Sequence, residues 1–523
     1  MIWKRISNIG YVMLLFGNGC SLNKDIYERN RYSYTVDLTN MTNDQIHVEL
    51  IPPKLINDSI EFVFPVSELA YYNDDLNHGK LISNLQVYDA QRHLLKTNKK
   101  ADNRWVIYEA NRIEKLEYTV DDIWEVRDSL SSWLSSENIF NKGSVMQLSP
   151  NATFGYFDGI DQLEFEVALK VPEDLYLVSG LLNAGASDKS VNIHATNYIE
   201  LSDYPLLFIN QKPVQFKISN AVMEVGVYSE QGKIETEWVA NQIKPAIEAI
   251  SAYFKGRLPV EKYAFMIYFY SGNIFAATAS EHNTSSIWVQ PEDWDDRMLG
   301  SSLAEMIKNT ALHEFLHIYA PLNIHSEEKL QFDFDQPQMS KHLWFYEGTT
   351  TYLQELIKVN QNLVSEEYFI TRINEILQEM QEYRTDVSLT EISKETYGDQ
   401  LGDQFDNVEL RGFLVNMILD IKLREKSNGL YGLKNLIIDL CNKFGRNKSF
   451  KDDAFFSEIS EITQFPELLD FLEKYVDGTD SLPLEETFKK VGYEYNTTTN
   501  SITKMNKPTD KQEILKNNWL RHR

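Results

Sequence analysis

Cysteine is scarce in this sequence, with only Cys20 and Cys441 among 523 residues. Cys441 lies in the apolar, helix-like run from Leu433 to Cys441, where a buried and unreactive thiol is expected. Cys20 lies near the N-terminus, far from that run. Two cysteines in such different positions are not expected to form a disulfide bond that stabilises the fold. The chain must therefore rely on hydrophobic cores, and its length allows two to four domains.

Positively charged residues are also fewer than negatively charged ones. The chain has 51 Lys and Arg against 77 Asp and Glu, which gives a net charge of −26 at pH 7. A surface this negative repels phosphate backbones, so nucleic acid is excluded as the expected partner. The sequence has no internal repeats and no low-complexity tract, and its 43% hydrophobic and 24% charged residues are ordinary for a soluble globular protein.

Long apolar runs are missing as well. The run Ile9–Phe16 follows Lys4 and Arg5 and is too short to span a bilayer as a mature helix. This arrangement predicts an export signal over residues 1–20. Gly17-Asn18-Gly19-Cys20 resembles the end of a bacterial lipoprotein signal, which implies lipid attachment at Cys20 and a membrane anchor on the periplasmic or cell-surface side. Gly17 stands where such signals usually carry Leu, so a secreted protein with an incidental cysteine is the alternative.

The pattern of apolar residues divides the rest of the chain into a β half and an α+β half. Short segments with period two, such as Ile46–Leu50 and Leu163–Val167, predict an N-terminal antiparallel β domain of sandwich type. A mixed sheet, a central helix and several amphipathic helices follow. The predicted divisions are 21–31 for a tether, 32–222 for the β domain, 223–359 for a catalytic domain, 360–495 for a helical subdomain and 496–523 for a polar, poorly ordered tail.

The stretch His313-Glu314-Phe315-Leu316-His317 carries the strongest chemical signal. It lies in a run from Leu303 to Ala320 that predicts a helix ending before Pro321. On a helix, His313 and His317 project from one face a turn apart, as two zinc ligands require. Glu314 lies beside that face, where a carboxylate can act as a general base. The alternative is a chance match, which we expect only roughly 0.01 times in a chain with ten histidines.

A catalytic zinc ion takes three protein ligands and keeps one position open. Glu347 is the favoured third ligand, because it is a lone carboxylate among aromatic residues on a predicted helix and needs a cation there. Its alternative role is a helix-start carboxylate favoured by the helix dipole. The other downstream candidates lie mostly in an acidic stretch without periodic pattern, where solvated carboxylates are common; they are His325, Glu327, Glu328, Asp333, Asp335 and His342.

Five segments, in order, resemble the glycyl aminopeptidase family of gluzincins. The first four are Ser280–Ser285, His313–His317, Phe332-Asp333-Phe334 and Leu343–Tyr352. The fifth is Arg411–Val415, together with Leu419-Asp420-Ile421 and Tyr475–Thr479 farther along the chain.

The resemblance covers about Met223 to Tyr495. It implies a thermolysin-like catalytic domain behind a β domain, and removal of small N-terminal residues from peptides. Carried over by position, His313, His317 and Glu347 would hold one Zn²⁺ and Glu314 would be the base. Glu281 and His282 would lie on the strand that receives the substrate.

The sequence departs from the family pattern at three places. Ala279 and Ser280 replace glycines before Glu281, which alters the expected amine pocket. The tyrosine that relatives carry just ahead of the Lys/Arg-Gly pair is missing before Arg411, so the oxyanion-stabilising hydroxyl is unassigned, with Tyr397 as a candidate. A PDZ-like module often follows in this family, and none is expected in the polar tail.

The leading hypothesis is zinc-dependent peptide hydrolysis by a zinc-bound water, with Glu314 as base and then acid. Substrate would add as a strand near Glu281, whose carboxylate would pair with the free amino terminus. That pairing favours aminopeptidase action. Two alternatives stay open: an endopeptidase on the same scaffold, and a membrane-tethered lipoprotein with a structural or binding role and an impaired zinc site.

Overall fold

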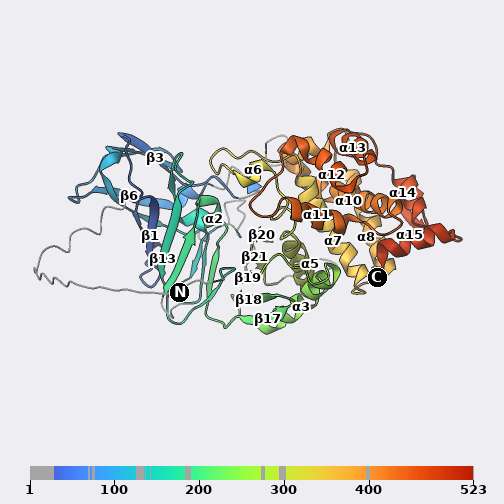
Figure 1. The fold of residues 1–523 in the computed structure, drawn as a ribbon. Helices are drawn as coiled ribbons and strands as arrows, with labels where there is room; N and C mark the ends of the chain where they lie inside the picture. The colour runs from blue at the N-terminus through green and yellow to red at the C-terminus, as the bar shows by residue number, and fades with distance from the viewer. Residues whose placement is uncertain are drawn as a thin grey trace, which may run out of the picture.

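The computed structural model describes residues 29–68, 71–72, 77–124, 135, 137–141, 143–182, 190–272, 277–293, 302–395, 398 and 401–521. The predicted export signal, Cys20 and Tyr397 lie outside these residues. Within the described parts, no helix is both long and apolar enough to cross a membrane. Figure 1 shows a β-rich half at one end of the molecule and a helical half at the other.

The N-terminal domain is a sandwich of two sheets, as the period-two pattern predicts. One sheet has the strand order β15-β13-β1-β2-β9-β6 and the other β12-β3-β8-β7. Their facing side chains are aromatic: Tyr118 of β9 meets Phe62 of β3 and nearby Phe64, and all three are fully buried. One pairing differs from the expected antiparallel arrangement, because β1 and β13 run parallel. The strands are β1 (Arg31–Asp37), β2 (Ile46–Ile51), β3 (Ser59–Val63), β6 (Ile82–Asp89), β7 (Thr97–Ala101), β8 (Arg104–Tyr108), β9 (Ile113–Val120), β12 (Tyr156–Phe157), β13 (Glu164–Lys170) and β15 (Ser190–Ala195).

A third sheet joins the two halves. It has the order β10-β11-β16-β14, from Ile139–Asn141, Val145–Leu148, Leu206–Ile209 and Tyr176–Val178. Val178 of this sheet packs directly on Gly226 of the next one: a Cβ at Gly226 would lie 2.3 Å from a methyl carbon of Val178. This contact, which only glycine permits, brings the β domain against the catalytic sheet.

The catalytic sheet has the order β17-β18-β19-β21-β20. Its strands are β17 (Val214–Ile218), β18 (Ala221–Ser229), β19 (Lys262–Tyr270), β20 (Thr278–His282) and β21 (Ser285–Pro291). The domain boundary expected at residue 222 falls inside β18, and β17 already belongs to this sheet. The strand expected to receive the substrate at Glu281 and His282 is one arm of a hairpin: β20 is the edge of the sheet, whereas β21 lies inside the sheet beside β19.

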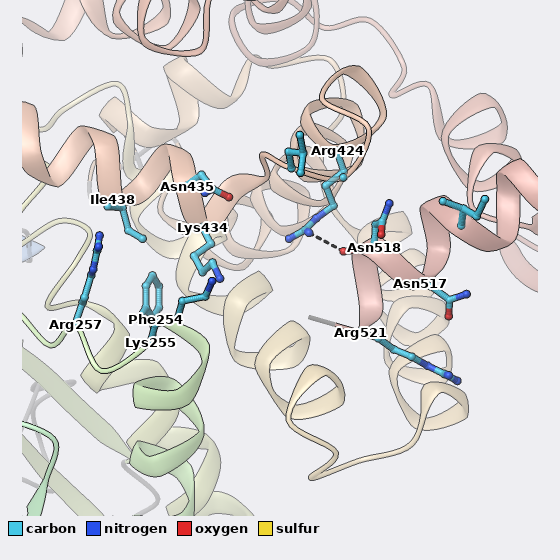
Figure 2. Close-up of a pocket in the computed structure, with 13 residues that line it drawn as sticks. Phe254, Lys255, Arg257, Arg424, Lys434, Asn435, Ile438, Asn517, Asn518 and Arg521 are labelled. Atoms are coloured by element: carbon cyan, nitrogen blue, oxygen red, sulfur yellow. Dashed lines mark hydrogen bonds between the residues drawn. The ribbon is translucent and has the colours of Figure 1, made fainter. Parts of the chain in front are cut away.

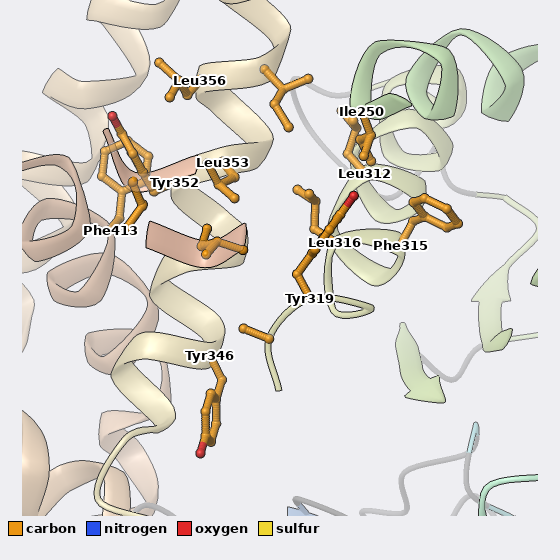
Figure 3. Close-up of a cluster of buried hydrophobic side chains, with 14 of the residues drawn as sticks. Ile250, Leu312, Phe315, Leu316, Tyr319, Tyr346, Tyr352, Leu353, Leu356 and Phe413 are labelled. Atoms are coloured by element: carbon orange, nitrogen blue, oxygen red, sulfur yellow. The ribbon is translucent and has the colours of Figure 1, made fainter. Parts of the chain in front are cut away.

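Helices α3 (Thr236–Tyr253) and α5 (Leu303–Leu316) pack together beside this sheet, and α7 (Leu343–Asn360) packs against both. Figure 3 shows the buried cluster that joins them, with Leu353 and Leu356 from α7 facing Leu312 and Leu316 from α5. The remaining helices form the helical subdomain: α8 (Glu366–Glu379), α9 (Leu389–Glu395), α10 (Phe405–Lys426), α11 (Leu433–Lys443), α12 (Phe455–Thr463), α13 (Glu467–Leu472) and α14 (Leu484–Lys490).

The expectation of a poorly ordered tail from residue 496 is wrong. Strands β22 (Tyr493–Asn496) and β23 (Ser501–Lys504) form a hairpin, and α15 (Asp510–Leu520) follows. Trp519 of α15 is fully buried and donates a hydrogen bond from Nε1 to the hydroxyl of Tyr352 at 2.8 Å. One apolar face on a short, otherwise polar helix is therefore enough to order this segment, because a large aromatic side chain buries so much area.

Candidate metal centre

Helix α5 presents the two histidines at its C-terminal end. Ser302 and Glu305 form a capping box that fixes its start. The helix ends at Leu316, four residues before the expected end, and His317 is the capping residue with φ −59° and ψ −18°. Because these dihedrals remain helical, the His313 and His317 rings still lie on one side, with centroids 4.8 Å apart.

Glu347 of α7 completes the group. Its Oε2 lies 3.4 Å from Nε2 of His313 and 3.6 Å from Nε2 of His317. A tetrahedral zinc ion with bonds of roughly 2.0–2.1 Å separates its ligand atoms by roughly 3.3–3.4 Å. The two measured separations match the edges of such a tetrahedron. The structure therefore brings together the three residues that the sequence favours as metal ligands.

The protonation of His317 also suits a ligand role. Its Nδ1 lies 3.1 Å from the carbonyl oxygen of Ala320, and this arrangement assigns the hydrogen to Nδ1. The lone pair is then on Nε2, the atom that faces Glu347. A backbone carbonyl that orients a histidine in this way is the usual support of a metal-binding imidazole.

The crossing of α7 and α10 holds Glu347 in place. A Cβ at Gly412 would lie 2.6 Å from the carbonyl oxygen of Trp344, so the two backbones touch. Farther along the same crossing, Thr349 donates to Asn416 at 3.0 Å and Tyr352 donates to Asp420 at 2.8 Å. Glu347 therefore stands on a rigid helix, which keeps its carboxylate at the histidines.

Glu314 lies beside the three ligands and is 7% exposed. One of its carboxylate oxygens lies within 4.8 Å of the potential metal-binding atoms of Glu281 and His317. Burial raises the pKa of Glu314 to about 8, against the opposing positive charge of His313. The charges of Glu281, Glu347 and Glu409 contribute to this rise. Four carboxylates thus crowd around one small space.

This crowding shows that the residues fit a cation. Burial alone would lower the pKa of His313, but its hydrogen bond to Glu347 and the charge of Glu314 raise it to about 9. A proton on His313 thus neutralises part of the surrounding negative charge. A divalent cation among the same atoms would do so more completely, and two imidazoles with one carboxylate are the donor set of catalytic zinc.

Glu409 is a further carboxylate beside the candidate ligands that the sequence reasoning missed. It lies on α10 one turn before Gly412, and its charge acts on both His313 and Glu347. Burial raises the pKa of Glu409 to about 7. A signal was present, since Glu409 stands between apolar Val408 and Leu410, the same kind of setting that singled out Glu347.

The predicted substrate residues point in different directions. Glu281 belongs to the group with Glu314 and His317, and its side chain is 18% exposed. His282 lies outside that group, and its Nδ1 is 3.4 Å from Oδ1 of Asp203 in the β domain. Alternation along β20 explains this, because successive side chains of a strand face opposite sides.

Lys329 is a second residue that the sequence reasoning missed. It lies on the short helix α6 (Glu327–Leu330), inside the stretch expected to be irregular. Its Nζ is 3.9 Å from Oε1 of Glu281, and its side chain is only 12% exposed. Lys329 therefore places an ammonium group beside the carboxylate that was predicted to receive the substrate's amino terminus.

Four of the other ligand candidates have partners elsewhere. His325 has Nδ1 3.0 Å from the carbonyl oxygen of Pro321, and His342 has Nε2 2.8 Å from that of Asp452. Asp333 accepts backbone hydrogen bonds from the turn that follows it, and Asp335 pairs with Arg104 of the β domain. These residues shape the stretch between α5 and α7 and do not join the metal group.

Two family models match the chain. Residues 33–210 match the peptidase M61 N-terminal domain, and residues 307–409 match the M61 glycyl aminopeptidase. Together they span more than half of the chain, and the second contains all three candidate ligands and Glu314. Among curated proteins, no sequence matches this one.

Solved structures of an aminopeptidase N family protein and of a zinc metallopeptidase share the fold. An aminopeptidase N family protein from Idiomarina loihiensis aligns with a TM-score of 0.73 and 20% identity, over 88% of this chain and 78% of that one. The M1 zinc metallopeptidase of Deinococcus radiodurans aligns with a TM-score of 0.52 and 12% identity, over 87% and 95%. A mutant of it bound to a Tyr-Ser-Ala substrate aligns with a TM-score of 0.53 over the same shares.

Proposed function

Because this chain belongs to the M61 glycyl aminopeptidase family of zinc metallopeptidases, we propose that it is an aminopeptidase that removes small N-terminal residues from peptides outside the cytoplasm. The observation that carries the proposal is the convergence of His313, His317 and Glu347 at tetrahedral separations, with Glu314 beside them. This group holds one zinc ion in the proposal.

When bound, zinc supplies a Lewis acid that polarises the scissile carbonyl and lowers the pKa of water toward 7. Glu314 accepts the proton that the attacking water loses as its oxygen bonds to the carbonyl carbon. The same carboxyl group then delivers that proton to the amine nitrogen as the C–N bond breaks.

The substrate's amino terminus would pair with Glu281. The edge strand β20 offers backbone groups to which an extended peptide can add as a further strand. Glu281 lies beside Glu314. If the substrate's ammonium group binds Glu281, its first peptide bond lies close to Glu314, so cleavage would remove a single N-terminal residue. The free amine must then compete with Lys329 for the Glu281 carboxylate.

That competition supports the second candidate, an endopeptidase on the same scaffold. If Lys329 keeps Glu281 paired, an internal peptide segment without an ammonium group could cross the site instead. The alternative of a structural lipoprotein rests on the unassigned oxyanion-stabilising hydroxyl, for which Tyr397 was the candidate.

Metal analysis and paired substrates test these possibilities. Purified protein is expected to carry one zinc per chain and to hydrolyse glycyl and alanyl reporter amides, whereas acetylation of their amino group abolishes cleavage. Equal cleavage of free and acetylated peptides would support the endopeptidase. Bound zinc with no hydrolysis of either set would support the structural role, and absence of zinc binding would overturn the metal centre itself.

Export and lipid attachment are part of the proposal. They rest on the segment from Lys4 to Cys20 in the sequence. Metabolic labelling with a fatty acid is expected to mark the full chain and to fail in a Cys20→Ser variant. Label on the variant would show that Cys20 is not the attachment point.

A further inference from the structure

A second cavity lies away from the metal centre. It has a volume of about 700 Å³ and opens between the end of α3, the start of α11 and the end of α15 (Figure 2). Five of its lining residues carry positive charge, namely Lys255, Arg257, Arg424, Lys434 and Arg521, and no Asp or Glu lines it. The chain has a net charge of −26, so this group of positive residues forms a region whose charge is opposite to that of the protein as a whole.

The positive groups converge on one space. Figure 2 shows the amines of Lys255 and Lys434 directed toward each other, with the guanidinium of Arg424 pointing into the same region. Arg424 and Lys434 are 3% and 4% exposed. Arg424 keeps one charged partner, since its Nε lies 2.9 Å from Oδ1 of Asp420. Arg424 also donates to the carbonyl oxygen of Asn518 at 2.6 Å, and Lys434 donates to that of Tyr253 at 3.2 Å. Like charges that line one cavity still repel one another, and an anion between them would turn the repulsion into attraction.

Two further features favour an anion. Burial, followed by the charges of Lys255 and Arg424, lowers the pKa of Lys434 to about 8, so an anion beside this amine would stabilise its charged form. Lys434 and Asn435 also lie in the first turn of α11, an 11-residue helix whose N-terminal end carries partial positive charge.

The cavity lining also includes two exposed apolar residues. Leu430 and Ile514 are 85% and 61% exposed, among the most exposed large hydrophobic residues of the described chain. A ligand with an anionic head and an apolar neighbour would use both features. We propose that this cavity binds a phosphate group, whose charge is held by Lys255, Lys434 and Arg424. Its source is either a soluble phosphate or the headgroup of a phospholipid, and the two share the chemistry that the cavity recognises.

The test uses the full chain and inorganic phosphate in chloride buffer, followed by titration calorimetry. We expect saturable binding at one site per chain, with Lys255→Gln and Arg257→Gln each weakening it by about fivefold or more. Both side chains are exposed, so these variants are expected to fold. Lys244→Gln is the matched control, because Lys244 lies on the exposed side of α3 outside the cavity.

Vesicles separate the two sources. Flotation with phosphatidylglycerol vesicles is compared with phosphatidylcholine vesicles, using protein that lacks any lipid anchor. Binding to the anionic vesicles that Lys255→Gln reduces would identify a headgroup site, since the net charge of −26 otherwise repels such vesicles. Phosphate binding without vesicle binding would identify a soluble phosphate. Failure of both probes, or equal binding by wild type and the cavity variants, would overturn the proposal whatever the peptidase activity.

Discussion

A Cβ built on Gly348 would lie 2.4 Å from the backbone carbonyl carbon of Gly412, so α7 and α10 cross with their backbones in contact. Glu347 precedes Gly348 directly, and Glu409 lies one turn before Gly412. The closest approach of the two helices is therefore also the point that sets two carboxylates beside His313. The metal centre depends on this crossing as much as on the two histidines.

The first prediction concerns this crossing. Gly348→Ala inserts a methyl group where no space exists, so α7 must move away from α10. We expect a loss of about 1–3 kcal/mol in the free energy of unfolding, and weaker zinc binding because Glu347 moves with the helix. Competition with a chromophoric chelator measures the zinc affinity. Gln354→Ala on the same helix is the control, and unchanged affinity in Gly348→Ala would show that the crossing does not position Glu347.

The second prediction separates the base from the ligands. Glu314→Gln is expected to retain zinc and to lower kcat by about 10³-fold, because proton transfer is lost while the ligand set stays intact. His317→Ala is expected to lose zinc and activity together. Zinc content and turnover are measured on the same preparations. Wild-type turnover by Glu314→Gln would remove the role assigned to this carboxylate.

The third prediction concerns Lys329. Because its ammonium lies 3.9 Å from Glu281, a substrate amine must displace it. Lys329→Met is therefore expected to lower KM for free-amine substrates by about three- to tenfold, as expected for removal of a partly buried competing charge. Lys329→Arg keeps the charge and serves as the control. A higher KM in Lys329→Met would mean that Lys329 holds Glu281 in place rather than competing with the substrate.

The fourth prediction is a pH dependence of stability at His325. Burial, followed by the charge of Lys329, lowers the pKa of His325 to about 4, well below the 6.5 expected in the unfolded chain. The unfolded state therefore binds the proton first as the pH falls. The contribution of neutral His325 is complete above pH 6.5 and is lost progressively toward pH 4, by about 3 kcal/mol.

Urea denaturation at a series of pH values checks this. His325→Asn keeps a donor for the Pro321 carbonyl but does not titrate, so its stability is expected to fall less between pH 6.5 and 4. His194→Asn, at an exposed position of β15, is the control. Identical acid sensitivity in wild type and His325→Asn would show that other groups account for it.

The sequence predicted the parts of this structure that depend on local pattern. Alternating residues identified the β sandwich, and the spacing of His313 and His317 identified the helix that carries two of the candidate metal ligands. Glu347 could be chosen because a lone carboxylate among aromatic residues needs a partner. Each of these signals lies within one segment and can be read without knowing what packs against it.

The remaining features depend on contacts between distant segments. Lys329 reaches Glu281 only because the chain after α5 folds back over β20, with Phe332 and Phe334 buried in the β domain. Glu409 reaches the metal centre only through the crossing at Gly348. The hairpin at residues 278–291 is not evident from the sequence pattern, because its two-residue turn, Asn283-Thr284, is short and polar like the strand before it. No local periodicity encodes these relationships.

The folded C-terminal segment gives the fifth prediction. Trp519 packs against Phe369 with ring centroids 5.5 Å apart and donates to the hydroxyl of Tyr352. Trp519→Ala leaves a large cavity and removes this donor, so we expect a loss of about 3–5 kcal/mol in the free energy of unfolding. Trp519→Phe keeps most of the ring and is expected to lose less, with about 1 kcal/mol for the hydrogen bond.

Circular dichroism during urea denaturation measures the effect without relying on the fluorescence of the substituted tryptophan. Because Tyr352 lies on the same helix as Glu347, we also expect zinc to protect Trp519→Ala against unfolding, since the metal ties α7 to α5 independently of α15. A denaturation midpoint equal to that of wild type would mean that α15 contributes no stability to the helical subdomain. If the denaturation midpoint is lowered and zinc does not raise it, the metal centre does not compensate for the lost packing of α15.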